Sequence, residues 1–260
     1  MKILVGVKHV PDTETEIRIA ADGRSIDESG VKWIVSPYDE YALEAALRIR
    51  EARDAGEVVA VCAGREAARA TLRHALAMGA DRAILLEDPR FERCDGLQRA
   101  RALAAIAAAE EPALVLLGKY GVGTDEGQTA PMLAELLGWP NASAVCRFEL
   151  TADGFRAERE VEGGREIVEG RLPAVISCDK GLNDPRYPSL KGIMQAKKKP
   201  LEVKTAGELG LEAAELDTPL LVLEKLEPPA PRPPGVRIEA PPLEAAERLV
   251  RLLHEQRKLL

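Results

Sequence analysis

The most chemically suggestive part of the chain is a glycine-rich segment, GKYGVGTDEGQT at 118–129, between an apolar run and a helix predicted to begin near Gln128. Glycine lets the backbone approach a ligand closely and adopt unusual dihedral angles. The amides of Gly127, Gln128 and Thr129 would lie at a helix N-terminus, where unpaired N–H groups and the helix dipole favour a phosphate. The segment is neither a Walker A loop nor a full GxGxxG. By itself it therefore favours a nucleotide site and a flexible strand-to-helix turn about equally.

Two further segments could reach the same place in the fold. The strand predicted at 2–7 ends in Gly6-Val7-Lys8, and Ser36-Pro37-Tyr38-Asp39 has the composition of a helix start, with a carboxylate where a capping box needs one. Tyr38 could stack on a base and Ser36 could bond a ribose, although both residues also serve as ordinary helix-start residues. Ligands of open α/β sheets bind at the carboxyl ends of strands. The three segments together favour a nucleotide site more than any one of them alone.

A fourth segment with possible chemistry is DPRYPSLKGIMQAKKKP at 184–200. Leu190, Ile193 and Met194 share one face of a short helix, and such a face usually belongs to the core. The flanking prolines and the run Lys197-Lys198-Lys199 are instead typical of a surface element. Exposed leucine and methionine beside lysines would form an adaptable apolar anchor for a partner protein.

Composition excludes several other classes of function. The net charge of −7 and the aromatic content of 3% argue against nucleic acid as a partner. With 30% charged residues there is no apolar run of the roughly 20 residues that a membrane span needs. The four cysteines form no CxxC pair and the three histidines are isolated, so neither a metal cluster nor a disulfide framework is expected. Cys62 and Cys178 end apolar runs and are predicted to be core thiols, without a nucleophile–base pair. The opening MKILVGVKHV has no leader-like character, which favours a cytoplasmic location.

The elements that must position these segments alternate between strand and helix. Short apolar strands are predicted at 2–7, 57–63, 83–87 and 113–118, and the helices between them begin at Ser36 or cover 65–78 and 95–109. Such alternation predicts right-handed crossovers and an open, mostly parallel, Rossmann-like α/β sheet with helices on both faces. After the first strand, EIRI and the extended stretch that follows Asp22-Gly23 predict a hairpin excursion.

The remainder of the chain has a different pattern. Three strands joined by glycine turns across 143–178 predict an antiparallel extension of the sheet. Residues 181–200 predict a loop with a short helix. The sequence thus predicts a nucleotide-binding α/β domain at 1–225, and at 226–260 a proline-rich linker with a helix at 243–259 that docks elsewhere, for example on another chain.

At this level of detail the sequence resembles a known family, the electron transfer flavoprotein beta subunit. The resemblance is carried, in order, by VKHVPD, SPYDEYALEAALRIRE, ALAMGADRAILLE, LVLLGKYGVGTDEGQTAPMLAELLGWP, EREVEGGREIVEGRLPAVIS and LNDPRYPSLKGIMQAKKKP. It covers nearly the whole chain and is weakest in the proline-rich tail.

The resemblance implies a heterodimer in which an alpha subunit holds most of a redox FAD and the beta subunit buries a structural AMP. It implies that the complex carries electrons from acyl-CoA and related dehydrogenases, as in fatty acid β-oxidation, and is not itself an enzyme. By position, the AMP-binding residues would be Gly6, Ser36, Pro37, Tyr38, Asp39, Ala63, Gly118, Lys119, Tyr120, Gly121, Val122, Gly123, Thr124, Asp125, Glu126, Gly127, Gln128 and Thr129. The partner-binding residues would be Leu190 as the apolar anchor, Ile193 and Met194 beside it, and Lys197, Lys198 and Lys199 as a basic flank.

Some positions depart from the family pattern. The phosphate loop reads GTDEGQT where many relatives have an acidic run followed by Cys-Asn, and Thr13 stands where some relatives place a tyrosine near the flavin. Glu160 matches an acidic residue near the flavin-domain interface. Some relatives bind a second FAD in place of AMP and bifurcate electrons, and the same arrangement is an alternative for this chain. Two competing interpretations are a stand-alone ATP- or AMP-binding regulatory module and a purely structural subunit with an empty site.

Overall fold

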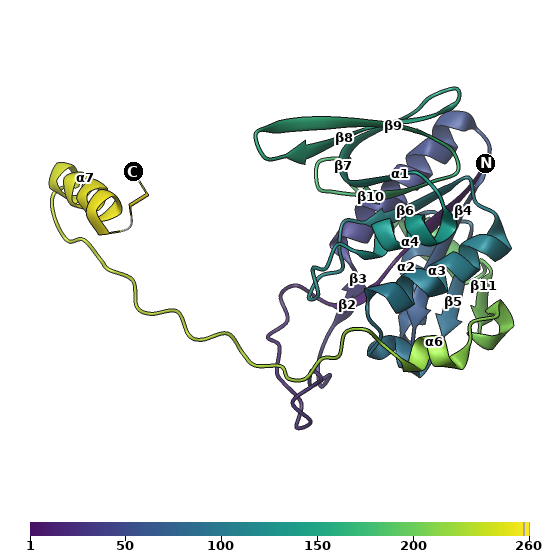
Figure 1. Cartoon of the computed structure of the whole chain (residues 1–260), viewed down its shortest axis with the longest axis horizontal. Coiled ribbons are helices and arrows are strands. Elements are labelled where there is room, and N and C mark those ends of the chain that lie inside the picture. Colours follow the sequence, from purple (N-terminus) through teal and green to yellow (C-terminus); the bar gives the residue numbers. More distant parts are fainter. Residues whose placement is uncertain (257, 260) are drawn as a thin grey trace. The chain divides into compact units, whose positions relative to one another are not determined.

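The computed structural model of the chain, shown in Figure 1, describes residues 1–256 and 258–259. The chain divides into two units, Met1–Lys225 and Leu226–Leu260. The first unit carries all the segments singled out above as candidate sites.

The first unit is built on a single large sheet. Among the described residues, nine strands pair in the order β11-β5-β4-β1-β6-β10-β7-β8-β9. All neighbouring pairs are parallel except β7–β8 and β8–β9. The prediction of an open, mostly parallel α/β sheet is therefore confirmed. The strands are β1 (Lys2–Gly6), β4 (Glu57–Gly64), β5 (Arg82–Glu87), β6 (Leu114–Gly118), β7 (Asn141–Leu150), β8 (Gly154–Val161), β9 (Gly164–Arg171), β10 (Ala174–Cys178) and β11 (Leu201–Lys204).

Helices cover both faces of this sheet, as Figure 1 shows. Alternate residues of β1 point to opposite faces, so Ile3 and Val5 join one apolar cluster and Leu4 joins the other. Because both faces must be apolar, the central strands are continuous apolar runs, as expected for a parallel sheet. The first cluster includes α1 (Pro37–Arg53) and α2 (Arg69–Met78), and the second includes α3 (Gly96–Glu110) and α4 (Thr129–Leu137).

The antiparallel extension differs from the prediction of three strands at 143–178. It contains β7, β8 and β9, but the apolar run that follows separates as β10 and pairs in parallel with β6 and β7. Proline has no backbone N–H to continue a ladder, so β9 ends before Pro173. Every residue of Ala174–Cys178 is buried, and a strand buried on both faces belongs in the middle of a sheet.

The chain between β1 and α1 makes the predicted excursion, with little regular structure. Its base is an antiparallel pair of short strands, β2 (His9–Pro11) and β3 (Trp33–Val35). Farther out, a single bridge joins Ile19 to Ile26, where a hairpin was predicted. Shorter elements complete the unit: α5 (Leu190–Ala196), α6 (Ala213–Asp217) and 3₁₀ turns at Glu66–Ala68, Pro89–Glu92 and Gly207–Leu209.

The second unit consists of an extended proline-rich stretch followed by α7 (Pro242–Arg251) and a π-helical turn at Leu252–Gln256. The prediction of a helix at 243–259 is too long at its end, because Lys258 has a φ of +50°, outside the right-handed helical region. Position 257, within the predicted helix, and position 260, within the predicted domain, lie outside the described residues.

Candidate functional site

The direction of the sheet's crossovers reverses at its central strand, β1. β1 lies between β4 and β6, and the helices that follow β1 and precede β6 cover opposite faces. Gly6 ends β1 and Gly118 ends β6, so these two glycines lie at the carboxyl edge of adjacent strands. Ligands of open α/β sheets bind at this position.

Asp39 ties the two strand ends to the start of α1. Its Oδ2 accepts a hydrogen bond from the backbone N–H of Lys8 at 2.7 Å, and its Oδ1 accepts one from Gly118 at 2.9 Å. A Cβ on Gly118 would lie 2.5 Å from Asp39 Oδ1 and 2.7 Å from the carbonyl carbon of Tyr38, so only glycine fits there. The three predicted segments 6–8, 36–39 and 118–129 thus meet at one place.

The predicted capping box at the start of α1 is wrong. The Ser36 side chain makes no capping hydrogen bond, and the Asp39 carboxylate faces the ends of β1 and β6 instead of the Ser36 amide. Burial disfavours the charged carboxylate and raises the pKa of Asp39 to about 7, although the two backbone N–H donors and Lys8 oppose the rise.

The glycine-rich loop is shaped by residues with positive φ. Gly123 has a φ of +94° and Gly127 of +64°, and Asp125 also lies in the left-handed region at +48°. The amides of Thr124 and Asp125 donate to the carbonyl of Gly121, so the loop forms a compact turn before α4. Gln128 is the N-cap residue of α4, one position before its first helical residue. The backbone therefore presents a helix N-terminus at the sheet edge.

The side chain of Lys8 reaches into this loop; the predicted segment 6–8 includes Lys8, but only Gly6 of that segment was predicted to contact the ligand. The Nζ of Lys8 donates to Thr124 Oγ1 at 3.1 Å, and the Lys8 side chain occupies the space that a Cβ on Gly121 would need. Burial, together with the nearby Arg99 guanidinium, lowers the pKa of Lys8. A sequence signal was present, because Lys8 follows the glycine that ends β1 by only two positions. A lysine at this depth suits an anionic ligand.

Tyr38, at the start of α1, contacts Tyr120 of the loop. The hydroxyl oxygens of Tyr38 and Tyr120 are 3.0 Å apart and their ring centroids 4.5 Å apart, and this hydrogen bond raises the pKa of Tyr38 to about 12. Lys119 pairs with Asp179 at 2.8 Å and its Nζ lies 5.6 Å from the centroid of the Tyr120 ring. These aromatic and charged groups surround the same strand ends.

Ser36 supplies a direct test of whether a ligand fits here. Ser36 is fully buried, and its Oγ has no hydrogen-bond partner among the described residues. A buried hydroxyl without a partner is costly, and native structures usually satisfy such a group. The free hydroxyl, the loop amides and the Lys8 ammonium together fit a small polar ligand that carries an anionic group.

The segment 184–200 presents its apolar side chains to solvent. Leu190 is 83% exposed and Met194 71%, and Ile193 is also exposed, so the core interpretation of this helical face is wrong. Lys197 and Lys198 are exposed as well. Lys199 differs, because its Nζ donates to the carbonyl oxygens of Leu76 and Ala80 at 3.1 and 2.6 Å.

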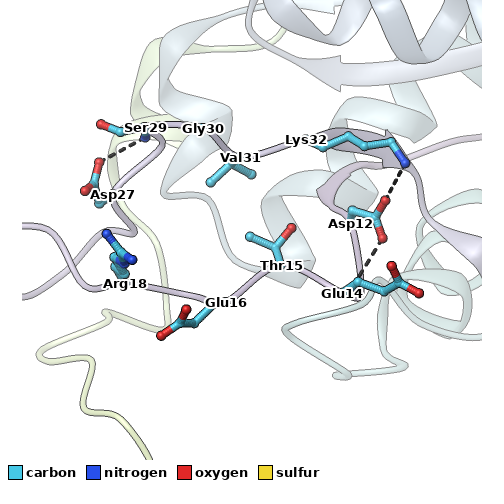
Figure 2. Close-up of a pocket in the computed structure, with 10 residues that line it drawn as sticks. All are labelled: Asp12, Glu14, Thr15, Glu16, Arg18, Asp27, Ser29, Gly30, Val31 and Lys32. Atoms are coloured by element: carbon cyan, nitrogen blue, oxygen red, sulfur yellow. Dashed lines mark hydrogen bonds and ion pairs between the residues drawn. The ribbon is translucent and has the colours of Figure 1, made fainter.

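Other regions offer less defined chemistry. A hollow of about 430 Å³, shown in Figure 2, lies in the excursion between β2 and β3, and none of its ten lining residues belongs to the three site segments. Asp12 and Lys32 form an ion pair on its wall. Among the described residues there is no cluster of metal-ligating side chains, and the four cysteines are free thiols. Each helix in the described part of the chain is too short or too polar to span a membrane.

A mostly parallel open sheet, a reversal of the crossover direction at its central strand β1 and a glycine-rich loop at that edge define an open, Rossmann-like α/β fold. The family model of the electron transfer flavoprotein domain matches residues 24–209. The chain is 41% identical to the electron transfer flavoprotein subunit beta of Bradyrhizobium diazoefficiens over 92% of this chain and 94% of the relative. It is 42% identical to the human protein of that name over 92% and 93%, and 37% identical to that of Bacillus subtilis over the full length of both. The chain belongs to the electron transfer flavoprotein beta subunit family, which confirms the resemblance.

Proposed function

We propose that the chain is the beta subunit of a heterodimeric electron carrier that accepts electrons from acyl-CoA and related dehydrogenases and passes them to a downstream acceptor. Membership of the family supports a role in electron transfer by a flavoprotein with a second subunit. The side chains of this subunit offer no redox centre of their own, so bound FAD, held mainly by the alpha subunit, would supply the redox chemistry. The chain is then a carrier subunit of fatty acid β-oxidation, in the cytoplasm, and not an enzyme.

Within this carrier, the beta subunit holds AMP at the carboxyl edge of β1 and β6. The observation that carries this proposal is the buried, unpartnered hydroxyl of Ser36 at the meeting point of three segments. Ser36 would bind the ribose, the amides of Gly127, Gln128 and Thr129 would bind the phosphate, and Lys8 would neutralise its charge. AMP has no reactive role in this scheme and stabilises the fold by binding only its native form.

Nucleotide analysis of the purified heterodimer tests the proposal. We expect one FAD and one AMP per heterodimer in an acid extract. Two FAD and no AMP would instead assign the second FAD of an electron-bifurcating flavoprotein to this site. An extract without AMP or a second FAD would mean that the site is empty and the subunit purely structural. Absence of any flavin would favour the stand-alone regulatory module, which the family assignment already disfavours.

The exposed side chain of Leu190 is the proposed anchor for the donor dehydrogenases. A carrier that meets several donors needs a small docking surface, and one buried apolar side chain can dominate the affinity of such a surface. We expect Leu190→Ala to raise the KM for the carrier about tenfold or more, a loss typical of an interface hot spot. Steady-state kinetics with an acyl-CoA dehydrogenase as donor measures this change.

Leu136→Ala serves as the matched control, because Leu136 is another exposed leucine on a helix of this unit. The control should leave the KM unchanged, and both variants should retain their flavin. Loss of flavin from Leu190→Ala, or an unchanged KM, would remove Leu190 from the docking surface.

A further inference from the structure

The segment 184–200 is tied to α1 at its beginning by a fork of hydrogen bonds. The Nε and Nη2 atoms of Arg186 donate to the Glu44 carboxylate at 2.7 and 3.1 Å, and its backbone N–H donates at 3.2 Å. The same guanidinium donates to both Glu51 oxygens, at 2.5 and 2.9 Å. A planar guanidinium held by two carboxylates has its position and its orientation determined.

Glu44 is the most enclosed member of this group. Its side chain is 3% exposed, and it also accepts a hydrogen bond from Arg48 Nε at 2.6 Å. Arg48 in turn donates to the carbonyl oxygen of Asp184 at 3.1 Å. Burial would raise the pKa of Glu44, but the hydrogen bonds from Arg186 and Arg48 outweigh it and lower the pKa. The carboxylate is therefore charged at neutral pH and tied to two points of the segment.

The middle and the end of the segment are attached to α2. A Cβ on Gly192 would collide with the carbonyl oxygen of Ala77, so the backbone of α5 lies directly on the end of α2. Arg73 Nη1 donates to the carbonyl oxygens of Ala196 and Lys199 at 2.5 and 3.1 Å. The Lys199 ammonium closes the contact from the other side, through its two bonds to carbonyls near the end of α2.

These attachments have a consequence for α5. A helix of seven residues has little stability by itself, because nucleation is costly and few hydrogen bonds follow it. Its outward side chains are exposed, so they contribute no burial that would hold it in place. The segment is therefore ordered by the contacts on its inner side, which are the polar contacts above and the burial of Ala196 in the core, while its apolar outer side remains available to a partner.

We propose that Glu44 is the positioning residue of the docking segment: its buried carboxylate holds Arg186 and Arg48, and so presents Leu190 and Met194 to partner dehydrogenases in a preorganised form. This inference rests on the docking function proposed above. Preorganisation strengthens binding because the ordering entropy of the segment is lost on folding and not on association. Glu44 itself touches neither the partner nor the cofactors in this scheme.

The test is Glu44→Gln in the purified heterodimer, which keeps the shape of the side chain and removes its charge. We expect amide hydrogen exchange across 184–196 to accelerate at least tenfold, since local opening no longer breaks a charged network. The KM for the carrier should rise about tenfold while kcat stays unchanged, because only association is affected. A role in fold stability alone would lower the melting temperature without changing the KM.

A second variant keeps the proposal testable if Glu44→Gln does not fold. Arg186→Lys preserves the positive charge but loses the planar fork, so it should accelerate exchange and raise the KM in the same direction. Glu169→Gln is the matched control, because Glu169 pairs with Arg156 on the exposed surface of β8 and β9. The control should change neither quantity.

Unchanged exchange across 184–196 in Glu44→Gln, or in Arg186→Lys where the first variant does not fold, overturns the positioning role. Faster exchange with an unchanged KM overturns it as well, provided that Leu190→Ala raises the KM. If Leu190→Ala leaves the KM unchanged, the proposed docking function is wrong. In that case, the hydrogen-exchange measurement alone decides whether Glu44 positions the segment.

Discussion

The buried carboxylate of Asp39 should give the stability of this protein an unusual dependence on pH. Its pKa is raised to about 7 in the folded chain from an ordinary value of 3.8. Between these two values the folded state holds a proton that the unfolded state does not. Stability therefore falls as the pH rises through this window, opposite to the usual behaviour of a paired carboxylate.

The size of the effect follows from the same two values. One pKa unit corresponds to about 1.4 kcal/mol, so the contribution of Asp39 should fall by about 2–3 kcal/mol between pH 5 and pH 8. Asp39→Asn removes the titration. It also removes one of the two acceptor oxygens that face the N–H groups of Lys8 and Gly118, at a cost of about 1–3 kcal/mol at every pH. The variant should be the less stable protein at pH 5 and close to the wild type at pH 8.

Other titratable groups lie near Asp39 and could affect the comparison of wild type with Asp39→Asn at the two pH values. Lys8 and Glu40 are the nearby charges, with Lys8 lowering and Glu40 raising the pKa of Asp39. The Cys62 and Cys178 thiols also face it, and burial raises the pKa of both, to about 12 for Cys62, so both stay neutral across the window. The thiols therefore contribute nothing to the change between pH 5 and pH 8, and Lys8 and Glu40 enter only through the pKa of Asp39.

The assay is urea denaturation of the full-length chain, with its partner subunit, at pH 5 and pH 8 and constant nucleotide concentration. The quantity to follow is the difference in unfolding free energy between wild type and Asp39→Asn. Asp153→Asn, at an exposed turn between β7 and β8, controls for the substitution itself. A difference that stays constant between the two pH values, or that grows at pH 8, would refute the account of Asp39.

Two further predictions concern the strand ends. Gly118→Ala should destabilise the chain by about 2 kcal/mol or more and lower its AMP content, because the new Cβ collides with Asp39. Gly207→Ala is the control, because a Cβ at Gly207 meets open space and should change neither quantity. Thermal unfolding measures the stability, and nucleotide extraction measures the AMP content. At the amino-terminal edge of the sheet, the Arg82 guanidinium lowers the pKa of the largely buried Glu110 to about 2. Glu110→Gln should therefore lower the free energy of unfolding by about 2–3 kcal/mol at pH 7. This loss should shrink as the pH falls from 4.5 towards 2, because Glu110 of the wild type then becomes protonated. A cost that is equal at pH 7 and pH 3, measured by urea denaturation, would show that the ion pair does not stabilise the fold.

Much of the candidate site could be predicted from the sequence because its parts are local. The glycines of 118–129, the helix start after Ser36 and the end of the strand at Gly6 each have a recognisable pattern, and the rule for parallel sheets brings their ends together. The role of Asp39 was missed, since its position suited a capping box equally well. Only the distance from its carboxylate to the backbone of β1 and β6 distinguishes the two roles.

The apolar and glycine patterns of the sequence determined the class of the sheet and its two apolar faces, because these follow from local periodicity and composition. The tertiary structure alone decided the place of β10 between β6 and β7, the attachment of Arg186 to Glu44 and the isolation of the Ser36 hydroxyl. Each of these depends on groups that are distant along the chain and meet only after folding. Whether a polar group finds a partner is a property of that three-dimensional arrangement, and no local pattern records it.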